Sequence, residues 1–346
     1  MSASKLVLGI ETSCDDTSVA IIGESILSHV SFSQIECLKS WGGVVPEIAA
    51  RNHLAKITPL LEEAKKQAGV SFKEISLLAV TSYPGLLGPL LTGINAAKTL
   101  SLIYQKPILP VNHLYAHLEA IHLTERISYP YLGVLLSGGH SLFVLAHSPG
   151  RFEILAGTID DAAGEAFDKG GKLLGLGYPA GHIIDKLAQQ GDAKRFEFPI
   201  GLKSSADARL SFSGTKTALR VFLEKNKELS LEKDSQDLKD ICASYQKSIV
   251  DAVALKLKYA LKELKQFNIN QCPIVVGGGV ACNSHLRACL QQKFKNVYFV
   301  SPQFCTDNGA MIANYGKIYF EDQIPFPECL EIDAKNRFIN KADFLK

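Results

Sequence analysis

His113 and His117 stand four positions apart, the spacing that brings both side chains to one side of a helix. Residues 114–123 contain no glycine or proline and follow a turn at Pro110, which predicts that helix. Two imidazoles placed in this way can bind one metal ion, although a third ligand must come from elsewhere. The alternative is that two of the nine histidines simply lie on a helix surface.

The residue beside this pair argues against one common use of paired histidines. A zinc peptidase helix reads HExxH, with a glutamate after the first histidine as general base, whereas Leu114 fills that position here. Zinc-peptidase chemistry is therefore disfavoured.

Three further segments join an apolar strand to a polar turn. The first strand, residues 6–10, leads to Glu11, Ser13, Asp15 and Asp16 and returns over 17–22 as a hairpin. The second repeats that hairpin half a chain later, over 131–146, with Ser137, Gly138, Gly139 and His140 in the turn. The third, 273–283, leads into a helix over 284–294. Each turn could hold a phosphate against backbone N–H groups, or could simply close a hairpin.

The elements between these turns predict the fold. Apolar residues at helical spacing predict helices over 52–68 and 237–267. A strand at 77–81, a helix at 90–104 and a strand at 108–111 precede His113, an order typical of an α/β fold. Two hairpin-led halves suggest the two-lobed architecture of actin-like ATPases and sugar kinases. We expect a first lobe over 1–125 plus about 308–325 and a second over 126–307, with a helical insertion at about 160–236.

Composition sets broader limits. With 346 residues, 47% of them hydrophobic, the chain can bury a full core. The 37 Lys and Arg residues nearly balance the 35 Asp and Glu residues, so a polyanionic partner must meet a local basic patch. The eight cysteines include no CxxC pair, which favours reduced thiols in a cytoplasmic protein. No apolar run reaches the length of a membrane span, so no membrane association is expected.

The ordered motifs of the chain resemble those of the TsaD family, bacterial tRNA N6-adenosine threonylcarbamoyltransferases once described as glycoproteases. The resemblance runs from about residue 6 to about residue 319. The matching segments are Gly9-Ile-Glu-Thr-Ser-Cys-Asp15, Gly42-Gly-Val-Val-Pro-Glu47, His113-x-x-x-His117, Ser137-Gly-Gly-His140, Asp160-Asp-Ala-Ala-Gly-Glu-Ala-Phe-Asp-Lys169, Ser211-Phe-Ser-Gly214, Gly277-Gly-Gly-Val280 with Asn283, and Cys305-Thr-Asp-Asn308.

The resemblance implies an actin-like fold and one Fe²⁺ or Zn²⁺ ion held by His113, His117 and Asp307. It also implies that threonylcarbamoyl-AMP binds between the lobes, at a site that ATP or AMP can occupy. The residues implied for this ligand are Leu135, Leu136, Ser137, Gly138, Gly139, Asp168, Gly181, Asp185 and Asn283.

The chemistry of these residues suits the implied ligand, and each has a structural alternative. Gly138 and Gly139 could offer backbone donors to a phosphate, or form a hairpin turn. Asp168 and Asp185 could accept from ribose hydroxyls, or be solvated helix carboxylates. Asn283 could contact the nucleoside, or cap its own helix.

Two positions depart from the family pattern and leave the shapes of two loops open. They are Ala180, where a second glycine is common and a positive φ would be disfavoured, and Tyr83, where glycine usually precedes Pro84.

The implied reaction moves the threonylcarbamoyl group to the N6 amine of the adenosine 3′-adjacent to the anticodon, in tRNAs that read codons starting with A, and releases AMP. Asp15, Asp16 and His140 are candidates for accepting the amine proton. The alternative for each is an ordinary turn or strand-end residue. Glu11 stands where actin-like enzymes often carry an acidic residue on the phosphate side, or is a solvated turn carboxylate.

A tRNA substrate requires cations. Residues 165–225 carry ten Lys and Arg against seven Asp and Glu, a local net charge of +3. With the resemblance, Lys194, Arg195, Lys203 and Arg209 become candidate phosphate contacts; without it, the segment is a solvated surface. The family further implies a paralogous, non-catalytic TsaB-like subunit, a small TsaE-like ATPase, and a separate synthase that supplies the adenylate.

Two other classes of function remain open. A small-molecule kinase would use the same fold with ATP but gives the histidine pair no role. A non-enzymatic, ATP-switched scaffold would need a client-binding module after the nucleotide domain, which is not expected here.

Overall fold

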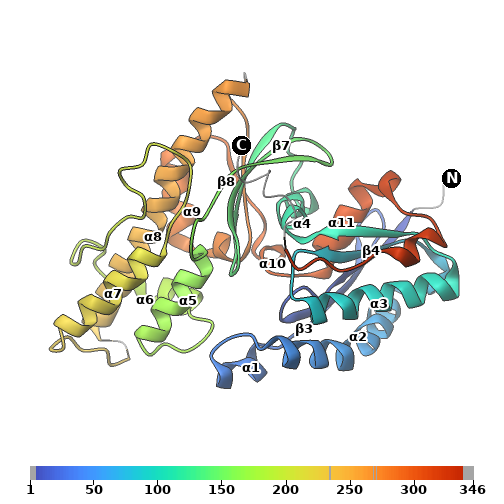
Figure 1. The fold of residues 1–346 in the computed structure, drawn as a ribbon, viewed down its shortest axis with the longest axis horizontal. Helices are drawn as coiled ribbons and strands as arrows, with labels where there is room; N and C mark the ends of the chain where they lie inside the picture. Colours follow the sequence, from blue (N-terminus) through green and yellow to red (C-terminus); the bar gives the residue numbers. More distant parts are fainter. Residues whose placement is uncertain (1–4, 234, 268, 270, 338–346) are drawn as a thin grey trace. The chain divides into compact units, whose positions relative to one another are not determined.

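The computed structural model describes residues 5–337 except 234, 268 and 270. The chain divides into two compact units, of which the first consists of residues 5–126 with 306–337 and the second is Ile127–Cys305. Each unit is built around one five-stranded sheet covered by helices (Figure 1). The predicted α/β class is therefore confirmed.

The sheet of the first unit has the strand order β3-β2-β1-β4-β5. Strands β1, β2 and β3 are antiparallel neighbours, whereas β4 and β5 run parallel to β1. The strands are β1 (Leu6–Glu11), β2 (Asp16–Ile22), β3 (Ile26–Ser33), β4 (Ile75–Tyr83) and β5 (Ile108–Asn112). The helices are α1 (Ile35–Leu38), α2 (Pro46–Ala68), α3 (Leu87–Tyr104), α4 (His113–Glu119) and α11 (Gly309–Ile318), with short 3-10 helices at Lys39–Trp41, Phe72–Glu74, Ala120–Leu123, Phe320–Asp322 and Glu328–Glu331.

The sheet of the second unit repeats this topology with the order β8-β7-β6-β9-β10. Again three antiparallel strands come first, and two strands parallel to β6 follow. The strands are β6 (Tyr131–Leu136), β7 (Ser141–Ser148), β8 (Arg151–Gly157), β9 (Ile274–Gly277) and β10 (Val297–Phe299). The helices are α5 (Ala163–Leu173), α6 (Gly181–Ala188), α7 (Ser213–Lys225), α8 (Gln236–Glu263), α9 (Ser284–Lys293) and α10 (Pro302–Cys305), with 3-10 helices at Leu264–Phe267 and Gly279–Cys282.

Local sequence signals explain where the helices of the first unit begin and end. Helix α2 starts at Pro46, whose fixed φ suits the first helical position, and ends at Gly69 in a left-handed conformation with φ 66°. Helix α4 starts directly after β5, because the Asn112 side chain accepts hydrogen bonds from the backbone N–H groups of Leu114 and Tyr115 at 2.9 and 3.3 Å. That cap fixes the orientation in which His113 leaves the strand.

Helix α11 packs closely on the first sheet. A Cβ atom at Gly9 of β1 would lie 2.4 Å from the backbone nitrogen of Ala313, and one at Gly309 would lie 2.7 Å from the nitrogen of Ala20. Only glycine allows backbones to approach so closely. As a result, the residues just before α11 are held at the end of β1 where Glu11 lies.

Candidate metal centre and nucleotide turn

His113 and His117 meet at the start of α4, as their spacing predicts. Their Nε2 atoms are 3.2 Å apart, and both side chains are buried, with exposed fractions of 7% and 1%. The rings pack edge to face with centroids 4.6 Å apart. The surface-histidine alternative is therefore wrong.

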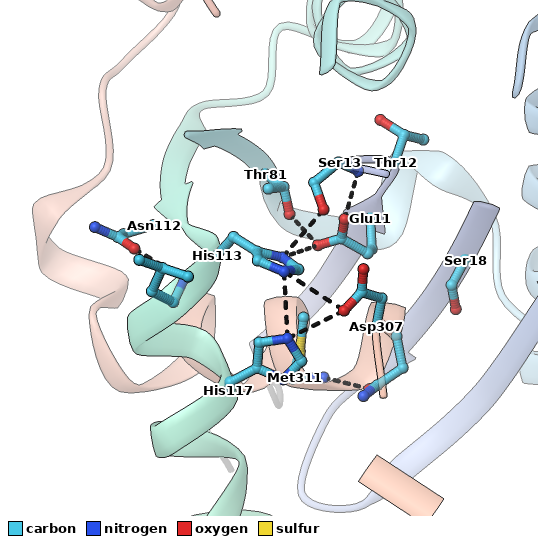
Figure 2. Close-up of polar contacts among 12 residues, drawn as sticks. Glu11, Thr12, Ser13, Ser18, Thr81, Asn112, His113, His117, Asp307 and Met311 are labelled. Carbon is cyan, nitrogen blue, oxygen red and sulfur yellow. Dashed lines mark hydrogen bonds and ion pairs between the residues drawn. The ribbon is translucent and has the colours of Figure 1, made fainter. Parts of the chain in front are cut away.

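Asp307 completes the cluster from the segment between α10 and α11. Its Oδ1 atom lies 3.1 Å from His117 Nε2 and 3.4 Å from His113 Nε2 (Figure 2). Asn308 caps α11 through a 2.8 Å hydrogen bond from the Met311 N–H group, which fixes the backbone beside Asp307. The close packing of α11 on β1 brings this distant residue to the histidine pair.

These three donor atoms fit one metal ion. Donors that share a tetrahedral ion at about 2.0–2.1 Å are about 3.3–3.4 Å apart, close to the observed 3.1, 3.2 and 3.4 Å. Among the described residues, this is the group of histidine, cysteine and acidic side chains that meets the spacing of a metal site. Two imidazoles and one carboxylate suit iron or zinc.

Glu11 fixes the orientation of His113. Its Oε2 atom lies 3.0 Å from His113 Nδ1 and accepts a 2.6 Å hydrogen bond from the Thr81 hydroxyl, while Oε1 accepts a 2.6 Å bond from the Ser13 N–H group. Because an ionised carboxylate only accepts, His113 Nδ1 donates to it and leaves the Nε2 lone pair directed at the cluster. Glu11 is fully buried, so the alternative of a solvated turn carboxylate is wrong.

The imidazoles and carboxylates of this cluster shift one another's pKa values. Burial opposes the charged form of His113, but the Asp307 and Glu11 carboxylates more than offset it and raise the His113 pKa well above its usual value. Burial likewise opposes ionisation of Asp307, yet His113 and His117 hold its pKa well below the usual range. The arrangement therefore favours a positive charge at its centre, which a cation would provide.

Asp15 lies in the turn between β1 and β2, and Asp16 is the first residue of β2. The Asp16 Oδ1 atom is buried and has no hydrogen-bond partner among the described residues. Burial, followed by the nearby Asp307 charge, raises the pKa of Asp16 to about 7. Asp16 therefore combines a side-chain oxygen that has no hydrogen-bond partner in the described part of the chain with a pKa suited to proton transfer near neutral pH.

His53 holds the same turn, and the sequence analysis did not identify it. This fully buried α2 residue donates from Nε2 to the Cys14 carbonyl at 3.0 Å and accepts from the Thr17 hydroxyl at Nδ1, at 2.8 Å. A lone histidine within a helix pattern gives no sequence signal for such a contact. Its position explains how α2 fixes the backbone that carries Asp15 and Asp16.

The second unit contains the predicted turn between β6 and β7. The Ser137 N–H group donates to the His140 carbonyl at 2.8 Å, and the His140 N–H group donates to the Ser137 hydroxyl at 3.1 Å. A Cβ atom added at Gly138 or Gly139 would meet nothing within 4 Å, so space is open beside both residues. Leu135 and Leu136 are fully buried strand residues, and their contact with a ligand stays a prediction.

Two other glycines, Gly164 and Gly278, pack closely against the backbone of this turn. The Gly164 N–H group at the start of α5 donates to the Ser137 carbonyl at 3.2 Å, and a Cβ there would lie 2.7 Å from that oxygen. At Gly278, with φ +87°, a Cβ would lie 2.4 Å from the Leu136 carbonyl oxygen. The turn is thus packed on one side and open on the other.

The remaining predicted ligand residues make contacts at the starts of helices. Asp168 accepts a 2.8 Å hydrogen bond from the Ala180 N–H group at the start of α6. Asp185 accepts from the backbone and hydroxyl groups of Ser284, at 3.0 and 2.8 Å. Asn283 caps α9 by accepting from the Leu286 N–H group at 2.9 Å, which is the structural alternative predicted for it. Their nucleotide contacts stay predictions, as does that of Gly181.

The departure at Ala180 is accommodated by a second glycine. Ala180 has φ −103°, so this position does not need the left-handed conformation that glycine favours. Its methyl group occupies the place that a side chain at Gly171 would take, since a Cβ at Gly171 would lie 2.0 Å from the Ala180 Cβ. Tyr83, the other departure, ends β4, where burial raises its pKa.

The candidate RNA contacts divide into two kinds. Arg195 is bound to Asp237 and Asp240, at 2.7 and 2.8 Å, and Arg209 is bound to Asp207 at 2.8 Å. Lys194 and Lys203 are exposed, and no ion pair engages their side chains within the part of the chain that the structure describes. The two lysines are thus free to meet phosphates, whereas the arginines already hold carboxylates.

This division predicts different results for two adjacent substitutions. Arg195→Ala should lower the midpoint of thermal unfolding, because it leaves the buried Asp240 carboxylate without its cation. Lys194→Ala should leave that midpoint unchanged but reduce the salt dependence of tRNA binding by about 0.9 in the log–log slope. Calorimetry and binding titrations over a salt series measure both, and a destabilised Lys194→Ala variant would contradict this division.

Comparison with known proteins identifies the family. The sequence profile of TsaD, tRNA N6-adenosine threonylcarbamoyltransferase, matches residues 25–314. The chain belongs to this family. A relative of the same name from Anaeromyxobacter sp. (strain Fw109-5) is 46% identical over 318 residues, covering 90% of this chain and 93% of its own. Another from Thermosipho africanus is 45% identical over 332 residues, covering 94% and 98%.

Solved structures show the fold. Component A of (R)-2-hydroxyglutaryl-CoA dehydratase from Acidaminococcus fermentans superposes with a TM-score of 0.52 at 15% identity, covering 91% of this chain and 99% of its own. Full-length HypF gives 0.57 at 15% identity, covering 93% of this chain and 46% of its own. Both have the actin-like ATPase fold, which confirms the predicted architecture.

The family membership also confirms the predicted class of function. The chain is a transferase that modifies tRNA, and its relatives are named for the threonylcarbamoyl group. Among residues 5–337, apart from 234, 268 and 270, no helix has the length and apolar character of a membrane span.

Proposed function

We propose that this chain transfers the threonylcarbamoyl group of threonylcarbamoyl-AMP to the N6 amine of the adenosine 3′-adjacent to the anticodon, in tRNAs reading codons that start with A. A bond forms between the amine nitrogen and the carbamoyl carbon, and the bond from that carbon to the phosphate oxygen breaks. The amine loses one proton and AMP leaves. The observation that carries the proposal is the buried cluster of His113, His117 and Asp307 in a member of this family.

His113, His117 and Asp307 would hold one Fe²⁺ or Zn²⁺ ion. Such an ion, when bound, supplies a positive charge that stabilises negative charge on substrate oxygens. Glu11 keeps the Nε2 lone pair of His113 available to it. The two structural units would be the two predicted lobes, with the metal residues in the first and the nucleotide turn in the second.

The turn from Ser137 to Gly139 would bind the adenylate phosphate. Gly138 and Gly139 are exposed residues, and their N–H groups have no hydrogen-bond partner among the described residues. With open space at both Cα atoms, a phosphate can reach these donors without meeting a side chain. Asp168 of α5, Gly181 and Asp185 of α6, and Asn283 before α9 would surround the nucleoside, and ATP or AMP would occupy the same site.

Asp16 would accept the proton of the attacking amine. The adenine N6 lone pair is delocalised into the ring, so the amine needs a base once the new bond forms. The Asp16 Oδ1 atom has no hydrogen-bond partner among the described residues, which supports this role, and Asp15 and His140 stay the other candidates.

Asp16→Asn should lower the rate of the transfer step by about a hundredfold or more, because an amide cannot take the proton. In the wild type, a base with pKa about 7 is protonated at lower pH, so the rate should fall as pH drops through 7. Single-turnover rates between about pH 5.5 and 8.5 test both expectations. A wild-type pH profile retained in Asp16→Asn would remove Asp16 from this role.

The partners that the proposal requires follow from its substrates. Lys194 and Lys203 would contact tRNA phosphates, while Arg195 and Arg209 would shape the surface through their ion pairs. A separate synthase would supply the adenylate, and a TsaB-like paralogue and a TsaE-like ATPase would complete the system in the cytoplasm.

The test is mass spectrometry of nucleosides from tRNA incubated with the protein, its partner subunits and threonylcarbamoyl-AMP. A tRNA with adenosine beside the anticodon should gain threonylcarbamoyladenosine, and a matched tRNA with guanosine there should not. No modified nucleoside, together with ATP-dependent phosphorylation of a sugar, would instead support a small-molecule kinase.

A further inference from the structure

A pocket in the second unit lies away from the turn described above. It has a volume of 310 Å³ and is lined by the end of α8, the 3-10 helix after it and the segments before β9 and β10. Ile274 begins β9 and Asn296 precedes β10, so the pocket lies at the N-terminal ends of these parallel strands. The Ser137 turn follows the C-terminal end of β6, which runs parallel to β9. The length of β6 separates the two sites, about 20 Å.

The lining of this pocket combines three chemical features. Lys262, Lys265 and Lys295 are exposed at its rim, and no carboxylate belongs to its lining within the described part of the chain. Leucine and isoleucine side chains and Phe294 form the apolar part. Gln271 and Asn296 supply exposed amides.

The three lysines are not committed to carboxylates. No salt bridge engages them among the described residues, whereas the neighbouring Lys293 is bound to Asp251 at 3.1 Å. Glu263, the acidic residue nearest in sequence, accepts a hydrogen bond from the backbone of Ala208. Lys262 Nζ lies 5.0 Å from the centroid of the Tyr259 ring. The pocket therefore presents cations without carboxylate partners beside apolar side chains, a combination that suits an anion with an apolar body.

We propose that this pocket binds an unpaired nucleotide of the tRNA, with the base inside and neighbouring phosphates on the lysines. This proposal rests on the proposed function, because it takes tRNA as the substrate. Proteins that bind single-stranded RNA combine cations along the backbone with an aromatic or apolar platform for the base. The side-chain amides of Gln271 and Asn296 can also form hydrogen bonds with the edge of a base. An acidic peptide has no base and would leave these amides without that partner.

The lysines of the pocket would give the protein a second surface for contact with a large substrate. Sequence analysis placed the tRNA contacts in residues 165–225, but Arg195 and Arg209 there are bound to aspartates. The pocket offers instead three lysines without carboxylate partners among the described residues. A tRNA is long enough to reach both the pocket and the adenylate turn, so this surface would add affinity without touching the reacting atoms.

The experiment compares Lys262→Gln/Lys265→Gln with a matched control, Lys225→Gln/Lys227→Gln, which removes two exposed lysines from the end of α7. Binding of an unmodified tRNA transcript is measured by fluorescence anisotropy between about 50 and 200 mM salt. Losing two single-strand phosphate contacts should reduce the log–log salt slope by about 1.4 in the first variant only. AMP binding should stay unchanged in both.

A second variant tests the contact with the nucleotide base rather than the contacts with the phosphates. Asn296 has φ +56°, which glycine adopts freely, so Asn296→Gly removes the amide while keeping the backbone. It should weaken tRNA binding about two- to tenfold without changing the salt slope.

Three outcomes would overturn the proposal. They are equal slope changes in the two lysine variants, no change in either, and displacement of the RNA by a polyglutamate peptide in a way that needs Lys262 and Lys265. In each case wild-type transfer to tRNA would still proceed if the proposed function is right. Failure of the wild type to modify tRNA would instead remove the proposed function and this inference together.

Discussion

The double variant His113→Ala/His117→Ala should contain no bound metal and should lose transfer activity by about a hundredfold or more. Both side chains are buried and both direct Nε2 at the same point, so no remaining pair of donors could hold the ion. Inductively coupled plasma mass spectrometry of the purified protein measures metal per chain, and nucleoside analysis measures transfer.

Two further variants separate metal loss from misfolding. Asp307→Asn keeps the shape of the third ligand but removes its charge, and should also lose metal. Glu11→Gln should weaken metal affinity only about 10- to 100-fold, because Glu11 acts through His113. Unfolding temperatures report whether each variant folds. One metal ion per chain in the folded double variant would contradict the site.

Gly138→Val should abolish high-affinity AMP binding while leaving the fold intact. A Cβ at Gly138 meets no protein atom, so the valine can be accommodated, but it would fill the space through which a phosphate reaches the turn amides. Gly138→Ala should have a smaller effect of the same kind. Isothermal titration with AMP measures the affinity.

The contrasting position is Gly164, on the packed side of the same turn. Gly164→Ala should destabilise the protein, because its Cβ would lie 2.7 Å from the Ser137 carbonyl oxygen. The Gly138 substitution should therefore weaken AMP binding in a folded protein, whereas the Gly164 substitution should lower the stability of the protein. If the folded Gly138→Val variant binds AMP with unchanged affinity, the turn only closes the hairpin and does not bind the phosphate.

Local patterns predicted the elements that carry the site. Both hairpins form where the alternating strands and polar turns placed them, and α4 begins at His113. The predicted helix over 237–267 ends at Glu263 as an α-helix and continues as a 3-10 turn. The strands β3, β8 and β10 were missed. Polar residues interrupt the apolar residues of β3, β8 buries only Ile154 and Gly157, and β10 has only three residues.

Long-range contacts could not be predicted from periodicity. Asp307 reaches the histidines because α11 packs on β1 through Gly9 and Gly309, 300 positions apart in sequence. Without the family resemblance, nothing near Asp307 marks it as a ligand. The burial of Glu11 and the contact of His53 with the Cys14 carbonyl also depend on tertiary packing.

Charge counting was the weakest predictor of function. The net charge of residues 165–225 did not reveal that Arg195 and Arg209 are held by aspartates. Counting also missed the lysines that gather at the end of α8, since Lys295 is 30 positions away from Lys265 in the chain. A basic surface is defined by which cations lack carboxylate partners, and this is known only once the chain has folded.

The most direct test of the central claim follows one atom from donor to product. Threonylcarbamoyl-AMP labelled with carbon-13 at its carbamoyl carbon is incubated with the protein, its partners and unmodified tRNA, and the tRNA is digested to nucleosides. We expect the label in threonylcarbamoyladenosine, with AMP released in equal amount, and its loss in the His113→Ala/His117→Ala variant. Release of AMP without labelled nucleoside in the wild type would contradict the account.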